Sequence, residues 1–130
     1  MITKAFTKFS ITTELRKLIV ADSGLTNLVG TNVFPIVAPE GTEGDTIIYY
    51  REKYAKQHTQ FGIYEEKCNV TFIIVSEDYD RSIAITEALN DLIEGIHQNK
   101  DNYNYECRLV DSIEDLIDKK YIQTLQFEIK

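Results

Sequence analysis

The chain has 130 residues, of which 43% are hydrophobic and 27% are charged, and its formal net charge is −7. This length predicts one domain over residues 1–130, because about 100–150 residues fill a typical single domain. The composition excludes wholesale disorder and fibrous repeats. The longest apolar run, Phe72 to Val75, is far shorter than the ~20 residues that span a bilayer, and the first residues lack an apolar signal core. We therefore expect a soluble, unexported protein without membrane contact.

Charge and residue counts also argue against nucleic-acid and metal binding. The 14 Lys and Arg residues are scattered, so no basic stripe can displace the counterions of a duplex. Cys68 and Cys107 each lie among apolar neighbours, which predicts buried thiols in a reducing compartment and leaves a disulfide as the alternative. His58 and His97 stand apart with no carboxylate or cysteine cluster beside them. We expect no cofactor and no metal.

The N-terminal third predicts a helix followed by an edge strand. Apolar residues recur at helical spacing in the first segment: Ile11, Leu15, Leu18 and Ile19. Ser10, Thr12 or Thr13 is available as its N-cap and Gly24 as its stop. Residues 25–30 add one short turn. Pro35 then restricts residues 33–37 to an edge strand or an extended arm, because proline has no N–H for a central ladder position.

A loop, a strand and a hairpin tip are predicted next. Residues 38–45 hold two glycines, one proline and three acids, which is typical of a loop. Residues 46–56 are rich in isoleucine and tyrosine and predict a strand. Residues 53–62 are mostly polar, so we expect an exposed hairpin tip there, with the next strand beyond it.

Residues 68–96 form the best-specified unit of the chain. Cys68, Val70, Phe72 and Ile74 alternate with a second set of residues that becomes apolar only at its end, at Ile73 and Val75. A helical repeat follows at once, carried by Ile85, Leu89, Leu92 and Ile96. This pattern predicts a strand whose crossover helix packs back on the sheet.

The acidic run Glu77–Asp80 lies at the junction of that strand and helix. Several carboxylates within a few residues suit a divalent cation. Acids in the first turn of a helix also accept its free N–H groups and complement the positive end of its dipole. We favour the capping interpretation.

The C-terminal segments predict antiparallel strands. Residues 105–110 alternate, residues 111–118 are interpreted as an acidic connection with a bulge or a short helical turn, and residues 121–129 alternate strictly. The order is α-β-β-β-α-β-β. We therefore predict an α+β fold with a mostly antiparallel four- to five-stranded sheet and two helices packed on one face.

Candidate catalytic motifs have little support. Gly41–Asp45 lacks the lysine and hydroxyl of a phosphate loop. No serine has the context of a nucleophile elbow, and neither histidine has an evident orienting partner. The remaining enzymatic alternative uses Asp78, Asp80 and His58 with a metal ion. We predict that the chain is not an enzyme.

Tyrosine is unusually frequent for a chain without tryptophan. Tyrosines supply large contact areas at low entropic cost and favour interfaces, although strand propensity and half-burial explain them equally well. A helical layer on one sheet face leaves the second face in need of a partner. We expect an oligomer interface formed by Tyr49, Tyr50, Tyr54, Tyr64, Ile73 and Val75.

Several strings, in their order, resemble the tail-completion or tail-terminator proteins of long-tailed phages and prophages. They cover most of the chain: Leu25–Gly30 after the first helix, Asn32–Pro35, the loop after it, Ile47–Tyr50, Val70–Asp80 and the closing strand. None is a catalytic motif. The chain departs from some members in lacking tryptophan and an arginine-rich character.

The resemblance implies a structural protein that forms a ring, often a hexamer, at the head-proximal end of the tail. Such a ring stops tube growth and joins the tail to the head connector, and it is found in the virion after assembly in the bacterial cytoplasm. Its partners are the tail tube and the connector, and DNA passes through the ring without specific binding. An acidic lumen repels DNA, which is compatible with the net charge of −7.

The alternative function is a small cytosolic regulatory domain of ferredoxin-like type that binds a ligand as a dimer. A dimer with a defined small-molecule thermal shift favours this alternative. Ring-sized or concentration-dependent assembly favours the tail protein.

Overall fold

The computed structural model of the protein describes residues 8–58, 62, 64–96 and 105–130. A short 3-10 turn, Lys8–Ser10, precedes the first helix. The elements then follow in this order: α1 Ile11–Ala21, α2 Ser23–Val29, β1 Val33–Pro35, β2 Thr46–His58, β3 Tyr64–Ser76, α3 Tyr79–Glu94, β4 Cys107–Ile117 and β5 Lys120–Ile129.

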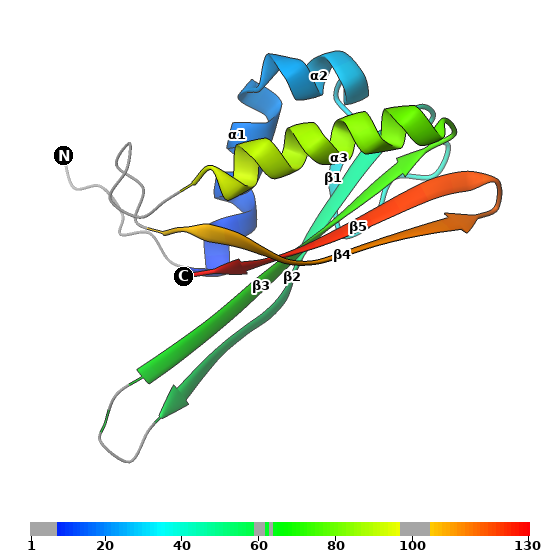
Figure 1. Ribbon diagram of the computed structural model, residues 1–130. Helices are drawn as coiled ribbons and strands as arrows, with labels where there is room; N and C mark the ends of the chain where they lie inside the picture. Colours follow the sequence, from blue (N-terminus) through cyan, green and yellow to red (C-terminus); the bar gives the residue numbers. More distant parts are fainter. Residues whose placement is uncertain (1–7, 59–61, 63, 97–104) are drawn as a thin grey trace.

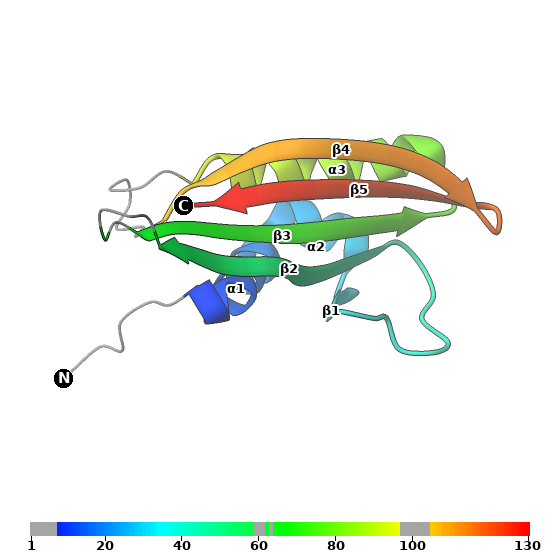
Figure 2. The ribbon, with the colours of Figure 1, turned by 90° about the horizontal axis from the view of Figure 1, so that it is seen from below.

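The strands form one five-stranded sheet in the order β1-β2-β3-β5-β4. Only β1 and β2 are parallel, and the other three pairs are antiparallel. The helices lie together on one side of this sheet, and the view from below shows the strands in front of them (Figures 1 and 2). The predicted α+β class, the mostly antiparallel sheet and the one-sided helical layer are confirmed, with α2 as a full helix where one short turn was expected. β1 lies at the edge, as Pro35 requires.

The first two helices meet at Asp22. Its carboxylate accepts a hydrogen bond from the Leu25 N–H at 3.0 Å, which caps α2. The predicted stop at Gly24 is therefore wrong, because the first helix already ends at Ala21 and Gly24 lies inside the second. The second helix ends at Gly30, whose φ of 60° favours glycine.

The core lies between the helices and the covered face of the sheet. Its two largest side chains, Phe72 and Phe127, pack edge to face with ring centroids 5.7 Å apart. The helices contribute buried side chains at helical spacing: Ile11, Leu15 and Ile19 from α1, and Ile85, Leu89 and Ile93 from α3. Ile93 was not among the predicted residues. Leu18 and Leu92, also predicted for the core, are only partly buried at its edge.

Asp78 starts α3. Its carboxylate accepts a hydrogen bond from the Asp80 N–H at 2.9 Å. This contact supports capping, rather than metal binding, as the role of the acidic run at the end of β3.

Replacing Asp78 with alanine is expected to reduce the free energy of unfolding by about 1 kcal/mol, because the first turn of α3 loses its side-chain acceptor. Urea denaturation followed by circular dichroism measures the change. Asp80→Ala is the matched control, since Asp80 lies in the same turn without serving as the N-cap, and its loss is expected to be smaller. Equal losses for the two variants would contradict the capping role.

Two strands are longer than predicted. β2 continues to His58 through a bulge between Arg51 and Lys53, where a polar hairpin tip was expected. β4 continues to Ile117, so the predicted acidic connection is wrong except for a bulge between Leu109 and Asp111. In both cases pairing along a neighbouring strand satisfies backbone groups that local polarity assigned to a loop. The tips of β2 and β3 extend past β5 as a two-stranded arm (Figure 1).

Candidate interface on the open face of the sheet

Strand alternation divides the sheet into a covered and an open face. Phe72 and Ile74 of β3 point into the core and are fully buried. Ile73 and Val75, which alternate with them along the strand, therefore point to the other side, where Figure 2 shows no helix in front of the strands.

The centre of the open face is apolar. The registers align Ile48 with Ile73, and Val75 with Ile122, on neighbouring strands. All four side chains are only partly buried, and Ile113 of β4, on the same face, is 58% exposed. We call these five residues the apolar stripe: Ile48, Ile73, Val75, Ile113 and Ile122.

A polar group borders the apolar stripe. The Glu52 carboxylate accepts hydrogen bonds from the Thr71 hydroxyl, at 3.0 Å, and from the Gln126 amide. These residues, with Tyr50 and Asp111 nearby, surround a shallow depression of about 150 Å³. An apolar centre with a polar border is the usual anatomy of a protein interface.

The predicted interface residues fall in different places. Ile73, Val75 and Tyr50 lie on the open face, since Tyr50 pairs with Thr71. Tyr49 points into the core and is only 6% exposed. Tyr54 lies on the helix side, packed edge to face on Phe9 with centroids 5.1 Å apart. The Tyr64 side chain is outside the described part of the chain.

Sequence reasoning missed the contribution of β4. Residues 111–118 carry four acids, which concealed the apolar positions between them. In the structure, Val110, Ile113, Leu116 and Ile117 are 46–58% exposed along this strand. The available signal was the recurrence of apolar residues within the acidic segment.

A second polar cluster holds the β4–β5 hairpin against α3. The Glu114 carboxylate accepts hydrogen bonds from the Tyr79 hydroxyl at 3.0 Å and from the Gln123 amide at 3.1 Å. The bond and the negative charge of Glu114 raise the pKa of Tyr79 above its usual value. Gln123 also reaches the Ser82 hydroxyl at 3.4 Å. This cluster fixes the orientation of the exposed hairpin.

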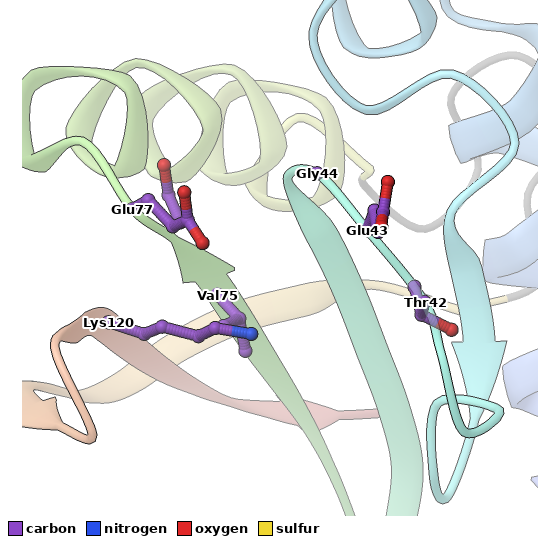
Figure 3. A pocket seen from close by; sticks show the side chains of 7 residues that line it. Thr42, Glu43, Gly44, Val75, Glu77 and Lys120 are labelled. Atoms are coloured by element: carbon purple, nitrogen blue, oxygen red, sulfur yellow. The ribbon is translucent and has the colours of Figure 1, made fainter.

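A cavity of about 340 Å³ lies at the end of the sheet beside the loop before β2. Figure 3 shows Lys120 and Glu77 on the strand side and Thr42 and Glu43 on the loop side. The Ser76 hydroxyl, which also lines the cavity, donates to the Asp45 carboxylate at 2.7 Å. That hydroxyl has a structural role, and the lining residues include no pair of nucleophile and base.

Asp45 connects the loop to the helices. Its carboxylate accepts from Ser76 and from the Arg81 guanidinium, the latter at 2.5 Å. Arg81 also donates to the Leu28 carbonyl at 3.0 Å. These contacts of Asp45 and Arg81 link α2, α3 and the end of β3. They give a structural role to Arg81, the basic residue that follows the acidic run Glu77–Asp80.

The residues of the enzymatic alternative are far apart. His58 ends β2, whereas Asp78 and Asp80 begin α3 at the opposite end of the sheet. Thr46 pairs with Val75 beside that helix, and the thirteen residues from Thr46 to His58, twelve steps of about 3.3 Å, span roughly 40 Å. These residues do not form one site.

Cys68 and Cys107 are both buried and are not joined by a disulfide. Each pairs with Ile129, from opposite sides of β5, so two strand spacings, about 10 Å, separate their backbones. This separation exceeds the reach of a disulfide. The predicted buried thiols are confirmed.

Cys107 is expected to resist alkylation in the folded protein. Burial, followed by the nearby Cys68 and Glu106, raises the pKa of the Cys107 thiol to about 12. The reactive thiolate is then about a thousandfold scarcer at pH 8 than in the unfolded chain. Iodoacetamide labelling with and without urea, read by peptide mass spectrometry, measures the ratio. Equal rates in the two states would contradict the burial of this thiol.

The fold defines a class of small α+β domain in which the helices cover one sheet face and the described residues leave the other face bare. No helix among the described residues combines the length and apolarity needed to cross a bilayer. In comparison with known proteins, no family model and no curated protein matches.

A chain of a solved structure, the virion of a native gene transfer agent particle, has the same fold. The TM-score is 0.72 at 17% sequence identity, and the alignment covers 88% of this chain and 89% of that chain. Because the sequence identity is this low, the comparison shows a shared fold and no more. The shared fold extends over nearly the whole of both chains.

Proposed function

We propose that this chain is a structural protein of a phage or prophage-derived particle, and specifically a tail-completion protein. It forms a ring at the head-proximal end of the tail, stops tube growth and joins the tail to the head connector. The observation that carries this proposal is the shared fold with a chain of a gene transfer agent virion. The sequence resemblance to tail-completion proteins supplies the finer role.

The open face of the sheet supports an assembly role. The apolar stripe crosses the middle of the sheet, and the described part of the chain places no element over it (Figure 2). Exposed apolar surface of this kind marks a contact with another protein of the particle. We assign Ile73, Val75 and Tyr50 to this interface.

The net charge of −7 also suits a ring that surrounds DNA. Like charge in the lumen prevents the duplex from binding as it passes. The ring then needs no basic groove and no base-reading side chains.

Deletion of the gene from its parent phage or prophage tests the proposed function. Electron microscopy of the lysate is expected to show filled heads separate from tails, with tails of variable length. Expression of the wild-type chain in trans restores joined particles. Joined particles with tails of uniform length in the deletion strain would contradict the proposal.

A further inference from the structure

The outer edge of β4 is long and exposed. β4 is the last strand in the sheet order and pairs with β5 on one side only. Its residues from Val110 to Ile117 are all exposed. Natural edge strands are usually short or protected by lysine and proline, whereas this one has eleven residues and contains neither.

Two aspartates occupy N–H groups along this edge. The Ser112 N–H donates to the Asp111 carboxylate at 2.9 Å, and the Leu116 N–H donates to the Asp115 carboxylate at 2.8 Å. These N–H groups therefore bond the preceding side chain and not a strand. A neighbouring strand can offer its backbone carbonyls to the Ser112 and Leu116 N–H groups, which releases the two carboxylates. Basic side chains on that strand can then pair with the carboxylates, so that each of these polar groups keeps a partner.

A second β4 does not meet this requirement. Antiparallel pairing centred on Ile113 places Asp111 opposite Asp115, and pairing one step away places Asp111 opposite Glu114. Like charges directly opposite each other destabilise a strand pair. The occupant should instead be a basic strand.

β2 is the basic strand of this chain. It carries Arg51, Lys53 and Lys56, and its only acid is Glu52, which is held by Thr71 and Gln126. β1 covers the β2 edge only opposite Ile47–Tyr49. The more distal part of β2 therefore extends beyond β1.

The strand directions fit a repeating contact. Three successive antiparallel pairs make β4 antiparallel to β2 within one copy. A copy rotated about an axis along the strands presents its β2 antiparallel to the β4 of its neighbour. The same contact then repeats around a closed ring, which is the geometry of heterologous assembly.

One register suits the side chains on both faces. With Lys53 opposite Asp115, Ala55 lies opposite Ile113 on the open face. On the helix side, Leu116 approaches the Phe9 ring, which is 69% exposed and packs against Arg51 and Tyr54. Two exposed apolar side chains are then covered together.

We propose that the outer edge of β4 pairs in antiparallel fashion with the β2 edge of a second copy of this chain, with Lys53 opposite Asp115. One sheet then continues from subunit to subunit. This inference rests on the ring of the proposed function and identifies the strands that close it.

Disulfide trapping in the full-length chain tests the pairing. Residues directly opposite on antiparallel strands lie within disulfide range. Mild oxidation of the Lys53→Cys, Asp115→Cys double variant is expected to give a ladder of linked oligomers that ends at a closed ring. The native cysteines are buried. The matched control, Lys53→Cys with Glu87→Cys on the exposed side of α3, is expected to remain monomeric.

Mixing the single variants tests the head-to-tail arrangement. Lys53→Cys and Asp115→Cys chains together are expected to give a 1:1 linked dimer, and neither alone gives one. Homodimers of either single variant, or equal ladders from the double variant and its control, would overturn the inference.

Charge reversal adds a second readout. Lys53→Glu and Asp115→Lys are each expected to reduce assembly by at least fivefold, which corresponds to about 1 kcal/mol for a cross-strand charge pair. Both reversals together should restore it; failure to restore it would overturn this register. The disulfide trapping and the gene deletion separate the two proposals. If the double variant gives a ladder but the deletion strain makes normal particles, only the tail function is refuted. If the deletion strain makes defective particles but the double variant gives no ladder, only the strand pairing is refuted.

Discussion

Replacing Phe72 with alanine is expected to reduce the free energy of unfolding by about 3–5 kcal/mol, because a fully buried aromatic ring is lost and a cavity remains. Phe72 is 0% exposed and packs on Phe127 at the centre of the sheet. Since a domain of this size is stable by only about 5–15 kcal/mol, the variant should be close to the unfolding threshold at 37 °C. Chemical denaturation measures the loss.

Phe9→Ala is the matched control for this change. The Phe9 ring is 69% exposed and contacts mainly Tyr54 and the Arg51 guanidinium. Its removal is expected to cost about 1 kcal/mol or less, as for other partly exposed contacts. A Phe72→Ala variant no less stable than Phe9→Ala would contradict the assignment of the covered face as the core.

Replacing Ile73 with glutamate is expected to abolish assembly while the chain still folds. Ile73 lies in the middle of the apolar stripe, paired with Ile48 and Thr124 on the open face, so the charge remains in water in the isolated chain. Stability should change by about 1 kcal/mol or less. Once the open face contacts another protein of the particle, an unpaired charge there costs about 2–5 kcal/mol, which predicts at least a tenfold loss of joined particles in the complementation assay.

Ala84→Glu provides the control for the added charge. Ala84 is exposed on α3, on the opposite side of the molecule from the apolar stripe. This variant should restore joined particles like the wild type. An Ile73→Glu variant that is folded and fully active in complementation would show that the open face is not an interface.

Local pattern was sufficient to predict the covered layer. The residues Ile85 and Leu89 recur at helical spacing, and Phe72 and Ile74 alternate in a strand, so each element buries one face whatever its partners are. The capping role of Asp78 also follows from sequence, because a helix start needs acceptors for its own N–H groups. The open-face position of Ile73 and Val75 follows from parity in the same way.

Strand ends and cross-sheet contacts were not predictable from local pattern. Residues 53–58 are mostly polar and residues 111–117 carry three acids, and only pairing with another strand makes them extended. The same pairing buries Tyr49 in the core while Tyr50 faces outward, a distinction that composition cannot make between two adjacent tyrosines. The contact of Asp45 with Arg81 joins residues 36 positions apart.

Pattern within single segments was therefore enough to predict the class of fold, the two longer helices, the core faces of β3 and β5 and the side of β3 that lacks a helix, because these depend on periods of 2 and 3.6. The sheet order and the strand lengths, and with them the exposed edge of β4, are visible only in the folded chain. Those features depend on hydrogen bonds between segments far apart in the chain, where the free energy of pairing exceeds the local preference for a loop.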